Sequence, residues 1–270
     1  MLKSFGLGDR IFERASFIAD EVSYNLVFRI CDSPQAVSLK SEDDTLLWAW
    51  TAPHHAWLWM DGGVAEKRRD ALFREVIASI DGELPGINGK PAVAELFARL
   101  FASAKGLVYR EHMRLEAYEC PAARKPTGVE GRIRQARIAD MMTVATFMAG
   151  FSEGAYGVAV TPESQLSGAE GLIANGDLYF WLEDDGTPVS MANIAHRSAK
   201  HARINAVYTP IEYRRRGYAG AVVAALCGRL EKERLMPMLY ADLANPASNQ
   251  AYRNVGFVER GWIAEYKFIS

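Results

Sequence analysis

Cysteine is scarce in this sequence. The three cysteines, Cys31, Cys120 and Cys227, are spread widely over 270 residues. An odd number of distant cysteines does not make a disulfide framework, and their spacing matches no pattern of metal ligands. This cysteine usage is typical of a reducing compartment, so we expect a cytoplasmic protein without a bound metal.

Long apolar runs and an excess of either charge are also missing. No stretch reaches the roughly 18 apolar residues of a membrane span. Residues 1–21 lack the apolar core and the cleavage site of a signal peptide. Lysine and arginine number 31 against 33 aspartates and glutamates, which gives a formal net charge of −2. This balance argues against a broadly basic surface, so we expect neither a membrane nor a nucleic acid as partner.

The residues that are present suit an ordinary globular protein. Hydrophobic residues make up 49% and charged residues 24% of the chain. The chain is long enough for one large or two small domains. The stretch CPAARKPTGVEG, residues 120–131, mixes proline, glycine and charge without periodicity. It predicts an N-terminal domain over 1–119, a linker over 120–130 and a C-terminal domain over 131–270.

Strand and helix patterns alternate in the C-terminal half. Alternating apolar and charged residues over 132–137 predict a strand, and a turn at Asp185-Gly186 predicts a hairpin over 177–196. The half therefore has a mixed α+β character, with an antiparallel hairpin and a later β-α-β unit. The further predictions are helices from Asp140 to Phe151, from Thr161-Pro162 onward, over 217–234 and over 246–255, and strands over 203–209, 236–243 and 256–269.

The N-terminal half ends in a similar way. TLLWAWT and AWLWM predict strands, residues 66–80 predict a helix, and a strand, turn, helix and strand follow. Asn88 stands before a helix that starts at Pro91, as Asn245 stands before one that starts at Pro246. The match favours an internal duplication, although any β-α-β unit with a proline-started helix looks the same.

The stretch YRRRGYAGAVVAAL, residues 213–226, joins three arginines to a glycine and then to a helical pattern of small residues. A helix N-terminus has unpaired N–H groups and a partial positive charge, and glycine lets a phosphate approach closely. A strand, this turn and this helix predict a pyrophosphate site. A solvated basic helix start would have the same sequence. The P-loop and dinucleotide-binding patterns are both absent from the turn.

The turn resembles the acetyl-CoA pyrophosphate loop, Arg/Gln-x-x-Gly-x-Gly/Ala, of the GNAT superfamily of N-acetyltransferases. AVYTP precedes it as the V-x-x-P strand does in that family, and a second family signature follows after one helix and one strand. The resemblance covers residues 131–270. The signature consists of Asn245, Ser248, Tyr252 and Gly256-Phe257.

The resemblance implies the GNAT fold, an α+β architecture with a central mixed, mostly antiparallel sheet flanked by helices. A smaller α+β N-terminal domain precedes it. If residues 1–119 form a second GNAT-like domain, that domain is degenerate, because it has no arginine–glycine loop.

The resemblance also implies a site for acetyl-CoA as co-substrate. In the family, the strand before the loop leaves its neighbour, and its backbone pairs with the pantetheine arm and polarises the thioester. The loop binds the pyrophosphate, and an asparagine on the next helix binds the arm. Carried onto this sequence, the residues are Val207, Tyr208, Thr209, Arg214, Arg215, Arg216, Gly217, Tyr218, Ala219, Gly220 and Asn245, with Asn249 one turn further along.

Tyr252 matches the tyrosine that lies near the sulfur in many members, which implies a general acid for the leaving thiolate. A phenol pKa near 10 suits that role, and an aromatic that packs the helix on the sheet is the alternative. Asp242 is the only carboxylate in the strand patterns RINAVYT and PMLYADL, where many members carry a glutamate base. It can deprotonate an amine through water, or it can cap the turn before Pro246.

The acceptor side is expected between the first two helices of this half and in the hairpin. Glu153 offers a charge for a cationic amine or is a solvated carboxylate, and Trp181 shares a strand face with Tyr179. The expected activity is N-acetyltransfer from acetyl-CoA to a primary amine by direct attack. The alternatives are an acetyl-CoA-binding sensor or accessory protein without turnover, and acyl transfer to a group other than an amine. A homodimer is compatible with the sequence, which does not fix the oligomeric state.

Overall fold

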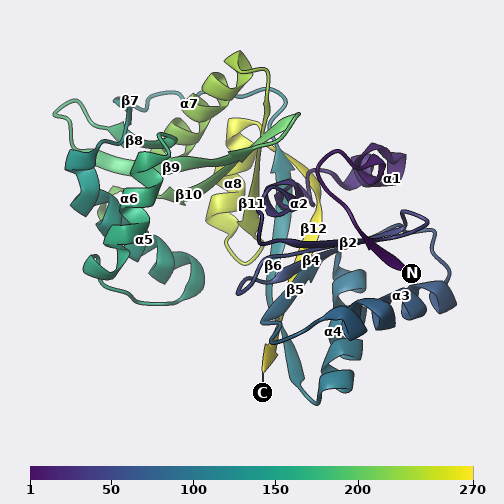
Figure 1. Cartoon of the computed structure of the whole chain (residues 1–270). Helices are drawn as coiled ribbons and strands as arrows, with labels where there is room; N and C mark the ends of the chain where they lie inside the picture. The colour runs from purple at the N-terminus through teal and green to yellow at the C-terminus, as the bar shows by residue number, and fades with distance from the viewer. Residues whose placement is uncertain (270) are drawn as a thin grey trace. The chain divides into compact units, whose positions relative to one another are not determined.

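A computed structural model describes residues 1–269 (Figure 1). Tertiary contacts divide the chain into two units. Unit 1 consists of residues 1–118, 240–245 and the chain from residue 259 onward. Unit 2 consists of residues 119–239 and 246–258.

Unit 1 is built on a sheet in the order β1-β2-β3-β4-β5-β12-β6, followed by the last residues of β11. Strands β1 to β4 are antiparallel neighbours, β4 and β5 are parallel, and β5 and β12 are antiparallel. The elements are β1 (Leu2–Ser4), η1 (Arg10–Glu13), α1 (Ala15–Asp20), α2 (Leu26–Cys31), β2 (Val37–Ser41), β3 (Leu46–Trp50), β4 (Ala56–Met60), α3 (Glu66–Ser79), β5 (Gly86–Gly89), α4 (Pro91–Lys105), β6 (Val108–Glu119) and β12 (Val258–Ile269).

The core of unit 1 lies on both faces of its sheet, because every residue of β3 and β4 is buried. Trp48 faces α4, with its ring centroid 5.4 Å from that of Phe97. Trp59 faces α1, with its ring 5.4 Å from that of Phe17. Burying these large aromatic side chains is a major contribution to the stability of the unit.

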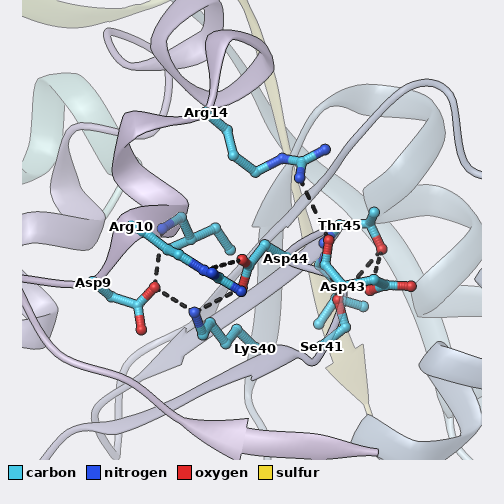
Figure 2. Close-up of polar contacts among 10 residues, drawn as sticks. Asp9, Arg10, Arg14, Lys40, Ser41, Asp43, Asp44 and Thr45 are labelled. Atoms are coloured by element: carbon cyan, nitrogen blue, oxygen red, sulfur yellow. Dashed lines mark hydrogen bonds and ion pairs between the residues drawn. The ribbon is translucent and has the colours of Figure 1, made fainter.

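A buried polar network ties the start of unit 1 to its sheet (Figure 2). The ammonium of Lys40 pairs with both Asp9 and Asp44, and Arg10 Nε donates to Asp44 Oδ2 at 3.0 Å. The side chains of Lys40 and Asp44 are only 4% and 8% exposed. Burial alone would lower the pKa of Lys40 and raise that of Asp44, but their hydrogen bonds and charges reverse both effects. The network therefore stays ionised.

Unit 2 is built on a sheet in the order β11-β10-β9-β8-β7, in which β10 and β11 are parallel and the other pairs are antiparallel. The elements are β7 (Arg132–Gln135), η2 (Ile138–Asp140), α5 (Met141–Tyr156), η3 (Glu163–Gln165), α6 (Leu166–Ala174), β8 (Leu178–Leu182), β9 (Pro188–Arg197), β10 (His201–Tyr208), η4 (Ile211–Tyr213), α7 (Tyr218–Lys232), β11 (Met236–Asp242) and α8 (Pro246–Val255). The last residues of β11, 240–242, belong to unit 1.

Alternate side chains of β8 face different helices. Phe180 packs against Phe147 of α5 at 5.7 Å between ring centroids, in a cluster with α6. Tyr179 faces α7, where the guanidinium of Arg229 lies 4.7 Å from its ring. The sheet of unit 2 is thus covered by α5 and α6 on one face and by α7 on the other (Figure 1).

The same succession of elements occurs twice along the chain. Leaving aside the 3-10 helices, β1-α1-α2-β2-β3-β4-α3-β5-α4-β6 is followed by β7-α5-α6-β8-β9-β10-α7-β11-α8-β12. In both runs the fourth strand pairs in parallel with the fifth. An internal duplication predicts this order.

Two element boundaries differ from the sequence-based expectation. The helix expected to end near Phe151 continues to Tyr156, because the left-handed residue that ends it is Gly157 with φ of 67°. The helix expected from Thr161-Pro162 begins as the 3-10 turn η3 before α6. The linker expected over 120–130 has no helix or strand in the described chain.

Candidate functional site

Strand β10 separates from its parallel neighbour before it ends. Its pairing with β11 stops at Arg203–Met238, although β10 continues to Tyr208. Against β9, its register shifts between Asn205 and Tyr208, where Ala206 has φ of 48°. Positive φ is unfavourable for alanine, and such bulges re-aim the chain next to binding sites. Within the described residues, the β11 edge of 204–208 is therefore free of ladder pairs and can pair with an extended ligand.

Ser190 fixes the end of this strand from β9. Its fully buried Oγ lies 3.1 Å from the carbonyl oxygen of Tyr208, to which it donates, and 2.9 Å from Oγ1 of Thr209. The ring of Tyr208 packs against Phe147 at 5.6 Å. Tyr208 and Thr209 are thus held from the β9 and α5 sides.

The turn formed by Arg214, Arg215, Arg216 and Gly217, which we call the arginine turn, has the backbone of an anion site. Arg215 has φ of 62°, and Gly217, the N-cap of α7, has φ of 84°. In the described chain, no backbone carbonyl accepts the N–H of Arg215, Arg216 or Gly217. Left-handed residues in such a turn direct successive N–H groups to one side, and the N-terminus of α7 adds its own N–H groups and partial charge. These donors fit a pyrophosphate.

The three arginine side chains of the turn are not equivalent. Arg214 Nε donates to the carbonyl of Thr209 at 3.0 Å, and its guanidinium lies 5.9 Å from the Tyr208 ring. Arg216 lies 3.7 Å from Glu183, which also accepts from the Tyr218 hydroxyl at 2.5 Å and thereby raises the pKa of Tyr218. Across residues 1–269, the guanidinium of Arg215 is the only one of the three without a hydrogen-bond or ion-pair partner.

Residues 120–131, which we call the connecting segment, run beside this turn. The N–H of Arg124 donates to the carbonyl of Val255 at the end of α8, at 2.7 Å. At its other end, the indole of Trp181 donates to the carbonyl of Glu130 at 3.0 Å. The segment therefore passes from α8 to β8 along the start of α7.

This path shows what Gly217 and Gly220 are for. A Cβ on Gly217 would lie 2.7 Å from Cγ2 of Val129, and one on Gly220 would lie 3.3 Å from Cγ of Pro126. The sequence favours glycine here for the approach of a phosphate. In the structure, Gly217 is needed for its positive φ and for the approach of the connecting segment.

The α8 residues of the predicted site are buried. Tyr252 is 9% exposed, its ring centroid lies 5.9 Å from that of Phe257, and burial raises the pKa of its phenol. Asn249 is 4% exposed, one turn earlier. Both side chains are buried in the structure.

The residues just before α8 form a turn in unit 1. Asp242 Oδ1 accepts from the N–H of Ala244 at 2.9 Å, and its carbonyl accepts from the N–H of Asn245 at 3.0 Å. These two bonds are the ones expected if Asp242 caps the turn before Pro246.

The two acceptor-side candidates in unit 2 face different ways. Glu153 is exposed on the last turns of α5. Trp181 alternates with Phe180, so it lies on the α7 face of β8, where it holds the connecting segment. The structure does not bring these two side chains to one face of the sheet.

Sequence reasoning missed four residues at this site: Ser190, Glu183, Ala206 and Val129. Ser190 had a signal, because it is a polar residue within an apolar strand pattern. Ala206 had none, since nothing about alanine predicts a positive φ.

The described residues, 1–269, contain no helix that is both long and apolar enough to cross a membrane. Within the same residues, His, Cys, Asp and Glu side chains do not gather in threes as a metal site would require.

Residues 147–257 match the acetyltransferase (GNAT) family. No curated protein matches the chain. Among solved structures, a GNAT-family acetyltransferase from Colwellia psychrerythraea is similar over 100% of both chains, with 13% identity and a TM-score of 0.59. A GNAT-type N-acetyltransferase from Sphaerobacter thermophilus is similar over 98% of this chain and 94% of its own, with 15% identity and a TM-score of 0.60.

A Drosophila protein reaches a TM-score of 0.65 at 12% identity, over 93% of this chain and 87% of its own. At such identities the likeness establishes the fold, and the family match over residues 147–257 supports an acyl-transfer function in general. The C-terminal half of this chain therefore carries a domain of the GNAT family of acetyltransferases, which occupies residues 147–257.

Proposed function

We propose that this protein transfers an acetyl group from acetyl-CoA to a primary amine by direct attack, and that residues 131–270 form the domain that does so. The observation that carries the proposal is the junction of two features in unit 2. The unpaired edge of β10 is followed by a turn whose N–H groups at residues 215–217 have no backbone acceptor within the described chain. An extended pantetheine arm joined to a pyrophosphate has the shape and chemistry that this junction requires.

Each part of the junction has a role in the reaction. The N–H groups of Arg215, Arg216 and Gly217 and of the first turn of α7 bind the pyrophosphate. The backbone of β10 holds the arm, which makes the amine's attack effectively unimolecular. One N–H among Val207, Tyr208 and Thr209 donates to the carbonyl oxygen as negative charge develops there. Acetyl-CoA supplies the activated acyl group and a thiolate leaving group.

We assign Tyr252 to the leaving thiolate and Asn249 to the pantetheine arm. Burial keeps the phenol of Tyr252 protonated but makes it a weaker acid. Its role is therefore to donate a hydrogen bond to the developing thiolate and to complete the proton transfer as the thiolate departs. We assign Asp242 to capping, on its bond to Ala244, and deprotonation of the amine to water.

We also propose that residues 1–119 are a degenerate second GNAT-like domain without a cofactor. The turn between β4 and α3 corresponds in order to the arginine turn but reads Asp61-Gly62-Gly63-Val64-Ala65. Asp61 accepts from the N–H of Gly63 at 3.0 Å, from Ser16 at 2.7 Å and from Arg14 at 3.1 Å. These bonds hold the pKa of Asp61 below its usual range. An internal carboxylate thus takes donors that a phosphate would need.

The gap beyond the short parallel pairing of β4 and β5 is filled as well. Residues 21–25 are all buried. Among them, the hydroxyl of Tyr24 accepts from the N–H of Lys90, at the start of α4, at 2.7 Å. The ring of Tyr24 packs on Trp57 of β4 at 6.1 Å. A pantetheine arm would have to displace this buried segment, which supports a single cofactor site per chain.

Calorimetric titration of acetyl-CoA into the full chain tests both proposals. We expect one site per chain and no binding to Gly217→Glu, which puts a negative side chain in the turn. Two sites would contradict the degenerate N-terminal domain. No binding by the wild type would overturn the proposed function.

Turnover is tested by the release of free thiol from acetyl-CoA in the presence of pooled primary amines. We expect release that depends on the amine. Tight binding without release, with amines and with other acceptor classes, would instead favour a sensor or accessory protein.

A further inference from the structure

The connecting segment contacts the arginine turn and the first turn of α7 at one point each. Pro126 lies against Gly220, in the first turn of α7, and Val129 lies against Gly217. Lys125 is adjacent to Pro126, and consecutive Cα atoms are about 3.8 Å apart. Lys125 is exposed, so its ammonium, carried on a flexible four-carbon stem, is available to an anionic ligand bound beside the turn.

This part of the connecting segment has hydrogen-bond donors to spare. In the described chain, the N–H groups of Lys125, Thr127 and Gly128, the hydroxyl of Thr127 and the ammonium of Lys125 have no partner. Gly128 has φ of 71°, so the segment bends sharply between its two contacts with the turn. The segment is fixed on both sides of this bend, by Arg124 and by Glu130.

The charge of the expected ligand exceeds what the turn provides. The nucleotide of CoA carries a pyrophosphate on the 5′ position of its ribose and a third phosphate on the 3′ position. Arg214 and Arg216 are engaged with Thr209 and Glu183, which leaves the side chain of Arg215 for the phosphates. A second cation beside the turn would complement the ribose phosphate.

We propose that the connecting segment is part of the cofactor site and that Lys125 binds the 3′-phosphate of CoA, with donors of residues 127–128 beside it. This assignment rests on the proposed use of CoA and adds a specificity determinant to it. The protein would then distinguish CoA from 3′-dephospho-CoA, although the arginine turn contacts only the pyrophosphate that both molecules share.

The test compares the affinities of CoA and 3′-dephospho-CoA for the full chain by calorimetry. We expect the wild type to bind CoA about tenfold more tightly, which corresponds to about 1.4 kcal/mol. In Lys125→Ala, the affinity for CoA should fall to that for 3′-dephospho-CoA, and the affinity for 3′-dephospho-CoA should stay unchanged. In Lys125→Glu, the order should invert, because a carboxylate repels the additional phosphate.

Lys232→Ala is the matched control, since Lys232 is an exposed lysine in the last turn of α7. It should keep the wild-type preference. Equal loss of both affinities in Lys125→Ala would overturn the assignment, because Lys125 would then serve the pyrophosphate. A wild type that does not distinguish the two nucleotides would overturn it too. A wild type that binds neither would remove the proposed function itself.

Discussion

Gly217 and Val129 are in contact so close that no side chain fits between them. A Cβ on Gly217 would lie 2.7 Å from Cγ2 of Val129, and the φ of Gly217 is 84°. Gly217→Ala therefore adds backbone strain and a clash. We expect the free energy of unfolding to fall by about 1–3 kcal/mol and the affinity for acetyl-CoA to fall by at least about tenfold, or 1.4 kcal/mol.

Gly228→Ala is the control, because Gly228 lies inside α7 and a Cβ there meets nothing within 4 Å. It should gain up to about 1 kcal/mol of stability and keep its affinity. Adding Val129→Gly to Gly217→Ala should restore part of the lost stability, since it removes the clash and leaves the strain. Equal behaviour of the two alanine variants in thermal melts would contradict this account of Gly217.

Ser190→Ala should loosen the end of β10. It removes the hydroxyl shared by the carbonyl of Tyr208 and by Thr209. We expect a loss of about 1 kcal/mol in stability and a rise in the Kd of acetyl-CoA, measured by denaturant unfolding and calorimetry. Ser164→Ala, in the exposed turn η3, should change stability by less than about 0.5 kcal/mol. A Ser190→Ala variant with wild-type affinity would show that β10 does not need this support.

Tyr252→Phe should lower kcat far more than it changes the KM for acetyl-CoA, if the phenol serves the leaving thiolate. A reduction on the order of 10²-fold is typical for the loss of a general acid. Phe257→Leu tests packing alone, because Phe257 is the ring partner of Tyr252. It should reduce stability and leave kcat nearly unchanged. Parallel losses of kcat and affinity in Tyr252→Phe would point to a packing role.

Lys40→Met should destabilise unit 1 strongly, because it leaves Asp9 and Asp44 facing each other without their shared cation. Breaking a buried ion pair in this way costs about 3–5 kcal/mol. Lys67→Met, at an exposed position of α3, should cost less than about 0.5 kcal/mol. A small effect of Lys40→Met in chemical unfolding would mean that the network in Figure 2 contributes little.

The same network predicts acid sensitivity. The pKa of Asp44 is lowered in the folded protein, so its contribution is present above the unfolded pKa of about 3.9 and is lost as pH falls through the folded value. Unfolding free energy should therefore decrease below about pH 4, and the decrease should be smaller in Asp44→Asn. A flat stability profile of the wild type between pH 5 and 2 would contradict this, as measured by thermal melts at about one-unit pH intervals.

Local signals in the sequence were sufficient for much of the fold. The pattern over 246–255 predicted α8 with its observed bounds, because Pro246 starts the helix and Gly256 follows its end. The β3 and β4 runs were recognisable from their apolar content. The first strand and helices of unit 1 went unpredicted, since β1 has three residues and α1 and α2 have six each, and no side chain caps either helix.

The features of the candidate site also divide into those that the sequence could predict and those that it could not. The arginine turn could be proposed from local sequence, because backbone donors at a helix start follow from it, and Tyr252 could be proposed from the resemblance to the family signature. The positive φ of Ala206, the contact of Val129 with Gly217 and the bond from Trp181 to Glu130 could not. Each depends on tertiary packing between residues that are distant in sequence, or on strain that the surrounding strands impose.

The place of β12 in the sheet has a consequence for how the chain folds during synthesis. This strand is synthesised after every other described element, yet it lies between β5 and β6 in unit 1. Until it arrives, β5 and β6 each have an unpaired edge of the kind that recruits foreign strands. The first half of the protein is therefore completed last, and a nascent chain stalled near residue 245 is the species that most needs a chaperone.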